Sequence, residues 1–189
     1  MRGVIRRDMY SQIRLLLVTL ALVSTNLNAE ELSVPFVVED ACPFEGCTFG
    51  EWNVLRETNI FQRPDENSTI TGKLSVGTKA SIVTGIIYVI PGEAIVTGKP
   101  YSHAEIMAPN KKVYILNYLG EGYSQVFLDG QFINTKIARE KNRCLDKPNW
   151  RYCWVKVIRE PVIKWWVNVQ DKGWILMDGK TLEPKDVLS

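Results

Sequence analysis

The chain has 189 residues, enough for one ordinary domain or two small ones and too few for most multidomain enzymes. Hydrophobic residues make up 46% of it and charged residues 23%, a composition that excludes disordered, collagen-like and low-complexity proteins. The formal net charge of +2 is mildly basic and, taken alone, suggests an anionic partner such as nucleic acid.

The first 29 residues have the pattern of a cleavable export signal. A basic start precedes a short apolar run at residues 15–23 and a small residue, Ala29, at a plausible cleavage point. The run is much shorter than the roughly 20 residues of a membrane-spanning helix, which favours cleavage over the alternative of a retained anchor. Removal of this segment takes away four of 23 basic and one of 21 acidic residues, which leaves a net charge of −1. Binding to nucleic acid, which needs clustered Lys and Arg, is therefore not expected.

Four cysteines, an even number in an exported chain, predict disulfide bonds in an oxidising compartment. Short spacings favour the pairs Cys42–Cys47 and Cys144–Cys153 over the two other connectivities, because each pair closes a small loop rich in Pro, Gly or Asn. The alternative is a four-thiolate zinc site, which the gaps and the export signal both disfavour. A redox dithiol would need a Cys-x-x-Cys motif, which the chain lacks. We expect neither a metal nor a cofactor.

Strand signals dominate the chain after residue 29. Short segments rich in β-branched and aromatic residues occur, in chain order, at residues 51–55, 80–83, 86–90, 113–116, 125–128, 154–158 and 165–169. Turn signals containing Pro, Gly or Asp-Gly separate them, and no segment keeps helical periodicity for three turns. The sequence therefore predicts an all-β protein, made of one or two small barrels.

Three stretches resemble bacterial SH3-like (Src homology 3-type) domains. Residues 59–83, with Arg63-Pro64 and a Gly-Thr turn, resemble the opening half of the family, where a Pro-containing loop and a turn precede a core strand. Residues 122–130 and 165–175 resemble the closing half, in which an alternating strand and a turn lead to a Gly-Trp-Val motif. The resemblance covers about half of the chain after the signal, and it implies an SH3-like fold and a ligand in the cell wall or envelope.

Residues 84–112 depart from the family pattern, because they separate the opening half from the closing half at 122–130. We expect them to contain an inserted hairpin that turns at Pro91-Gly92. The expected organisation is a signal peptide at 1–29, an N-terminal segment with a disulfide loop at 30–50, an SH3-like barrel at 51–137 with its insertion at 84–112, and a second, partial SH3-like module at 138–189.

The sequence gives little sign of catalysis. His103 is the single histidine, and such a residue is usually a surface or packing residue rather than a base or ligand. An enzymatic alternative would need His103 within hydrogen-bond reach of Glu105 or Glu121. Glu121, Asp129 and Asp178 adjoin glycines, and tight turns explain all three. With the four cysteines paired, no thiolate nucleophile remains, so we expect a non-enzymatic protein.

Aromatic residues indicate binding instead. Alternation along the strand at 165–169 places Trp165, Val167 and Val169 on a core face and leaves Trp166 among polar side chains, as in binding sites. Similar alternation at 123–128 separates Tyr123 from the residues that face the core. The expected binding residues are Tyr123, Gln125, Phe127, Trp166, Asn168 and Trp174. The alternative is that the two modules bury all of these rings.

Two functions follow as hypotheses. The first is an exported protein, periplasmic or extracellular, that binds cell-wall peptide or glycan or an envelope protein through its SH3-like modules and keeps no membrane anchor. The second is a structural or inhibitory partner of a secreted enzyme, which would act through the inserted hairpin at 84–98 or an edge strand.

Overall fold

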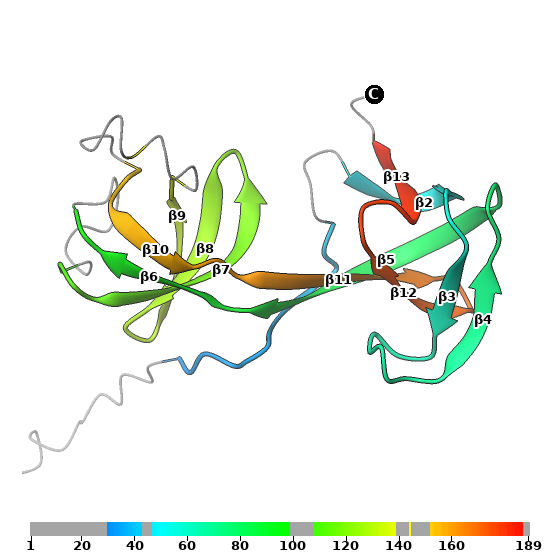
Figure 1. Cartoon of the computed structure of the whole chain (residues 1–189), viewed down its shortest axis with the longest axis horizontal. Helices are drawn as coiled ribbons and strands as arrows, with labels where there is room; N and C mark the ends of the chain where they lie inside the picture. Colours follow the sequence, from blue (N-terminus) through cyan, green and yellow to red (C-terminus); the bar gives the residue numbers. More distant parts are fainter. Residues whose placement is uncertain (1–29, 43–46, 99–107, 139–143, 145–151, 187–189) are drawn as a thin grey trace, which may run out of the picture. The chain divides into compact units, whose positions relative to one another are not determined.

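A computed structural model of the chain describes residues 30–42, 47–98, 108–138, 144 and 152–186 (Figure 1). The chain divides into two units, residues 1–30 and 31–189. The described part is almost entirely β, which confirms the predicted fold class. It contains no helix that is long and apolar enough to cross a membrane. The predicted export signal lies outside the described residues.

Eight strands form the larger of two sheets, which we call the large sheet. They are β1 (Phe36–Glu39), β2 (Cys47–Val54), β3 (Thr58–Phe61), β4 (Ile70–Leu74), β5 (Lys79–Ile90), β11 (Val162–Val169), β12 (Gly173–Met177) and β13 (Leu182–Asp186). Seven of them follow the order β13-β2-β5-β11-β12-β3-β4. β1 is the eighth and pairs with β5 at residues 86–89, whereas β2 pairs with β5 at residues 79–82.

The second sheet, the small sheet, has five strands in the order β10-β6-β7-β8-β9. They are β6 (Gly92–Val96), β7 (Lys112–Gly120), β8 (Tyr123–Leu128), β9 (Gln131–Lys136) and β10 (Val155–Arg159). All pairings between neighbours are antiparallel.

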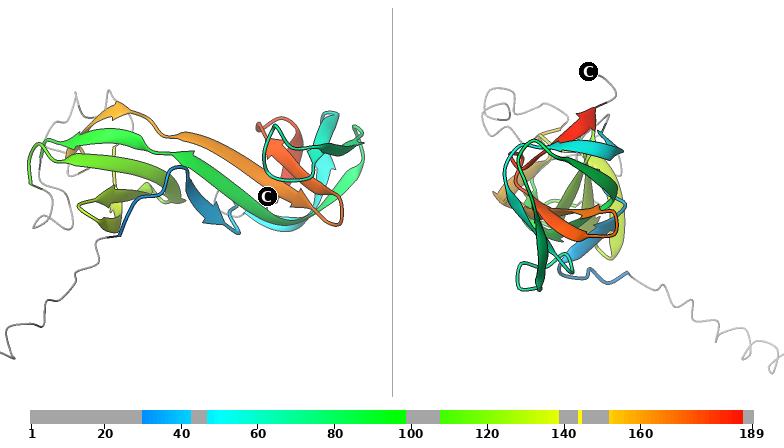
Figure 2. Two further views of the ribbon diagram at one scale, coloured as in Figure 1. Left: turned by 90° about the horizontal axis from the view of Figure 1, so that it is seen from below. Right: turned by 90° about the vertical axis from the view of Figure 1, so that its right-hand side faces the viewer.

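The hairpin expected at Pro91-Gly92 is not formed. β5 pairs with β11 and β6 pairs with β10, so residues 79–96 and 155–169 run antiparallel through both sheets (Figure 2). Gly92 is needed for close contact rather than for a turn, because a Cβ there would lie 2.6 Å from the carbonyl oxygen of Arg159. The prediction was wrong because a Pro-Gly pair is a turn signal only where the two flanking strands pair with each other.

The two sheets are not consecutive in the sequence. The large sheet is built from residues 36–90 and 162–186, and the strands of the small sheet lie between these segments. The expected boundaries at 51–137 and 138–189, with an insertion at 84–112, therefore differ from the boundaries of the sheets. Of the two stretches that resemble a closing half, the one at 165–175 pairs with the opening half, through β5 with β11 and β3 with β12.

Each sheet encloses an apolar core of its own. One core contains Trp52, Val54, Ile60, Leu74, Ala80, Ile82, Val167, Val169, Ile175, Met177 and Leu182. The other contains Ala94, Val96, Val113, Ile115, Val126, Leu128, Ile133, Ile137, Trp154 and Val155. The Nε1 groups of Trp52 and Trp154 each donate a 2.9 Å hydrogen bond, to the carbonyl oxygens of Thr48 and Lys136. Both buried indoles are thereby oriented without an unpaired donor.

Both predicted disulfides, Cys42–Cys47 and Cys144–Cys153, are present, and no cysteine is free. The alternative of a four-thiolate zinc site is therefore wrong. Two disulfides in a chain of this size indicate an oxidising environment.

Candidate functional site

A pocket of about 360 Å³ opens between the end of β1 and the end of β7. Its lining comes from four parts of the chain: residues 38–42, Ile87, residues 117–120 and Ile163. Ligand sites in proteins usually have volumes of about 300 to 1,000 Å³, so this pocket suits a small group such as one or two amino-acid side chains.

One wall of the pocket is apolar and belongs to the large sheet. Val38 on β1 lies directly opposite Ile87 on β5, and Ile163 on β11 lies opposite Val89, two residues further along β5. Opposite residues of an antiparallel ladder share a face, and the pattern repeats every two residues. The side chains of Val38, Ile87 and Ile163 therefore project from the same face of the sheet.

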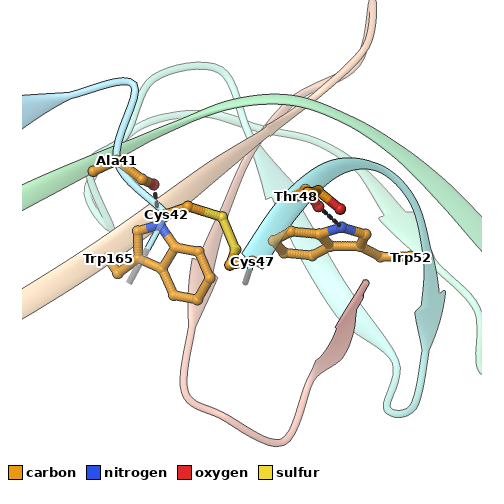
Figure 3. The surroundings of a disulfide bond; sticks show 6 residues. All are labelled: Ala41, Cys42, Cys47, Thr48, Trp52 and Trp165. Atoms are coloured by element: carbon orange, nitrogen blue, oxygen red, sulfur yellow. Dashed lines mark hydrogen bonds between the residues drawn. A yellow bond between two sulfur atoms is a disulfide. The ribbon is translucent and has the colours of Figure 1, made fainter. Parts of the chain in front are cut away.

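The loop after β1 forms the rim of this wall and is tightly held (Figure 3). The Nε1 of Trp165 donates a 3.1 Å hydrogen bond to the carbonyl oxygen of Ala41, and the Ala41 N–H donates one of 2.9 Å to the carbonyl oxygen of Gly85. The disulfide Cys42–Cys47 closes the loop one residue further on. The rim is thus fixed to both β5 and β11.

The opposite wall is a β-bulge in the small sheet. β7 has two residues, Leu116 and Asn117, where its partner β8 has only Gln125. Asn117 is 6% exposed and lines the pocket, and its Oδ1 has no hydrogen-bond partner in the described part of the chain. Because a buried polar atom without a partner costs about 1–3 kcal/mol, this amide requires an explanation.

Apolar side chains surround the mouth of the pocket. Tyr118 and Leu119 on β7 are 46% and 43% exposed, and Ile163 on β11 is 43% exposed. The hydroxyl oxygen of Tyr118 accepts a 2.9 Å hydrogen bond from the N–H of Gly122 in the β7–β8 turn, which orients the ring. Contiguous exposed apolar side chains of this kind often mark a binding surface.

Three of the six predicted binding residues lie on β8 of the small sheet. The expected alternation is confirmed, because Val126 and Leu128 belong to the core. Tyr123 is 39% exposed, and the Nζ of Lys136 lies 4.5 Å from its ring centroid. Gln125 is half-buried, and Phe127 is only 9% exposed.

Phe127 is covered by another ring. The centroid of Phe132 on β9 lies 4.9 Å from that of Phe127, and Phe36 on β1 lies 5.4 Å from Phe132. The prediction that Phe127 takes part in an exposed binding face is therefore wrong.

The other three predicted binding residues lie on the large sheet. Asn168 and Trp174 are half-buried and directly opposite each other on β11 and β12. Trp166 is 1% exposed, so the expectation that its ring is exposed is wrong. The ring of Phe61 meets it edge-on at 5.5 Å, and Glu66, in the loop after Phe61, pairs with Lys164 on β11.

The six predicted residues are thus divided between two sheets and form no single groove. The pocket was missed because most of its lining consists of apolar residues with no chemical signature. One signal was present: Asn117 is a lone amide within the apolar stretch at residues 113–119.

The carboxylates beside glycines are turn residues, as predicted. Asp129 and Glu121 have φ angles of 49° and 48°, and a glycine with positive φ follows each. Asp178 accepts hydrogen bonds from the Thr181 hydroxyl and the Lys180 N–H and pairs with Arg56, which together hold its pKa at about 2.

The described residues contain no group of three or more His, Cys, Asp or Glu side chains that could hold a metal ion. His103 and Glu105 lie outside the described residues, so the catalytic alternative at these positions stays a prediction.

No protein-family model matches the chain, and no curated protein and no solved structure is significantly similar to it. The pocket must be interpreted from its own chemistry.

Proposed function

We propose that this chain is an exported, non-enzymatic protein that binds the peptide part of the bacterial cell wall in the pocket between β1 and β7. The observation that carries the proposal is the pocket, which combines an apolar wall, an exposed apolar mouth and a buried amide. Apolar walls with a few polar groups are the usual pattern of small-ligand sites.

Export is supported by two features. The first is the signal-like pattern of residues 1–29, and the second is the pair of disulfides, which forms readily only in an oxidising compartment. The resemblance of three stretches to bacterial SH3-like domains supports a ligand in the cell wall.

The chemistry of the lining supports binding rather than catalysis. The carboxylate of Asp40 accepts a 2.6 Å hydrogen bond from Thr84, and alternation along β1 turns Glu39 to the opposite face from Val38. No acid and base are paired across the pocket in the described part of the chain. The lining also contains no Lys or Arg, which disfavours a phosphate or nucleotide ligand.

The second hypothesis, a structural or inhibitory partner of a secreted enzyme, relied on an inserted hairpin at 84–98 or on an edge strand. β5 and β6 continue through both sheets and do not form that hairpin. We therefore do not propose this function.

Co-sedimentation with purified cell-wall sacculi tests the proposal. We expect the protein to sediment with intact sacculi and to stay in solution with glycan from which an amidase has removed the peptides. Ile163→Glu places a charge in the apolar wall and should reduce retention, whereas Ile158→Glu, at a 58% exposed position outside the pocket, should not. Absence of retention on intact sacculi overturns the proposal, as does equal retention of the two variants.

A further inference from the structure

We propose that the pocket recognises a secondary amide that carries an apolar side chain, and that Asn117 binds the amide group. This inference rests on the proposed function, because it names the chemistry that the same pocket selects. It assigns a role to Asn117 Oδ1, the one buried side-chain atom of the lining that has no hydrogen-bond partner in the described part of the chain.

The carboxamide of Asn117 matches a peptide unit. It offers an acceptor and a donor side by side, as a peptide group offers a donor N–H and an acceptor C=O. The Oδ1 is covered by neighbouring atoms, but rotation of the amide about the Cβ–Cγ bond exchanges its oxygen and nitrogen without a change of volume. The rotated oxygen is therefore able to accept a hydrogen bond from the N–H of a ligand in the pocket.

Other ligand classes fit the pocket less well. An anion would find no Lys or Arg in the lining. A cation would find the carboxylate of Asp40 engaged with Thr84. Glu39 belongs to the lining, but alternation along β1 directs its side chain to the opposite face from Val38. A purely apolar ligand would leave the Asn117 oxygen without a partner, and the desolvation cost of that atom would remain.

The apolar part of the ligand is defined by the wall opposite Asn117. Val38, Ile87 and Ile163 project from one face of the large sheet, and Leu119 stands beside Asn117 at the mouth. A branched aliphatic side chain next to an amide, as in a peptide residue of the valine or leucine type, would contact this wall while the amide reaches Asn117.

The variant Asn117→Leu separates binding from folding. Leucine has a shape close to that of asparagine but no polar group, so the variant removes the unsatisfied buried Oδ1 and should not lower the melting temperature. Thr135→Val is the matched control, because Thr135 Oγ1 is the other buried atom without a partner among the described residues and does not line the pocket.

The experiment is a titration of the full ¹⁵N-labelled chain, followed by amide chemical shifts. The probe is N-methylisovaleramide, which has one secondary amide and one branched aliphatic group, and its control is methyl isovalerate, in which an ester oxygen replaces the N–H. We expect shifts at residues 117–120 and Ile163. Affinity should fall about tenfold for the ester, and about tenfold for Asn117→Leu with the amide probe, the loss that one hydrogen bond produces. Thr135→Val should bind as the wild type does.

Several results would overturn the inference: no shifts with the amide probe, equal affinity for amide and ester, unchanged binding by Asn117→Leu, or a fall in its melting temperature that Thr135→Val does not show. Undiminished retention of Asn117→Leu on sacculi overturns the inference and leaves the proposed function intact. Amide binding that depends on Asn117, together with no retention of the wild type on sacculi, overturns the proposed function alone.

Discussion

The indole Nε1 of Trp165 donates its hydrogen bond to the carbonyl oxygen of Ala41, a residue 124 positions away in the sequence. The bond ties β11 to the loop after β1, and it passes beside Gly85 on β5. Two strands and the loop after β1 therefore meet at one point next to the pocket, and this close contact depends on the absence of a side chain at residue 85.

We expect Gly85→Ala to lower the free energy of unfolding by about 1–3 kcal/mol, the usual cost of an extra methyl group in a filled space. A Cβ at this position would lie 2.3 Å from the Ala41 oxygen and 2.9 Å from the Trp165 Nε1. Gly72→Ala is the control, because its Cβ would make only an ordinary contact, 3.8 Å from the Cδ1 of Ile60. Urea unfolding, monitored by tryptophan fluorescence, gives the unfolding midpoint of each variant. Equal midpoints would show that the close approach at residue 85 does not affect stability.

The two disulfides should differ in their effect on the pocket. Each closes a short loop, so replacing either pair by serine should lower the free energy of unfolding by about 2–3 kcal/mol. Cys42 lines the pocket, whereas Cys144 and Cys153 do not. We therefore expect the Cys42→Ser, Cys47→Ser double variant to bind sacculi more weakly, and the Cys144→Ser, Cys153→Ser variant to bind as the wild type does under conditions where both are folded. Equal binding by the two would mean that the first disulfide does not shape the site.

Trp166→Ala should act on folding. The ring is 1% exposed and is in edge-on contact with Phe61, so its removal should cost about 3–5 kcal/mol of unfolding free energy. Tyr123→Ala, at a 39% exposed position, should change that free energy by about 1 kcal/mol or less. Thermal unfolding distinguishes them. A Trp166→Ala protein with wild-type stability but no retention on sacculi would restore the hypothesis of a binding role for this ring.

Local pattern was enough to predict strands within β2, β5, β7, β8, β10 and β11, the disulfides, and the core faces of β8 and β11, but β1, β9 and β13 were not among the expected strands. Val167 and Val169 are in one core, and Val126 and Leu128 are in the other, as alternation requires. Alternation also placed Trp166 on the outer face correctly. Its burial could not be predicted, because the residues that cover that face, Phe61 and the loop containing Glu66, are about 100 positions away in the sequence.

Long-range pairing decided the rest of the fold. Residues 122–130 and 165–175 have the same local pattern, and only the pairing of β5 with β11 shows which of them completes the sheet begun by residues 59–83. The pocket also depends on long-range pairing, since its apolar wall forms only when β1 and β11 are both placed on β5. Asn117 is visible in the sequence as a lone amide in an apolar strand. The bulge that places Asn117 in the lining of the pocket is not.

The stability of the β12–β13 turn should depend on pH through Asp178. The Thr181 hydroxyl contributes most to the lowering of its pKa, followed by the Lys180 N–H and by Arg56, and together they bring the pKa from 3.8 to about 2. Because the pKa is lower in the folded state than in the unfolded chain, the carboxylate contributes stability that is fully present above pH 3.8 and is lost as the pH falls through about 2. The difference in unfolding free energy between wild type and Asp178→Asn should therefore be largest near neutral pH and should shrink across this range. Urea unfolding at a series of pH values measures this difference.

Thr181→Val should remove more of the pH dependence than Arg56→Met, since the ion pair with Arg56 is largely exposed to solvent and weak. A profile for Asp178→Asn that stays parallel to that of the wild type would show that this carboxylate titrates alike in the folded and unfolded chains.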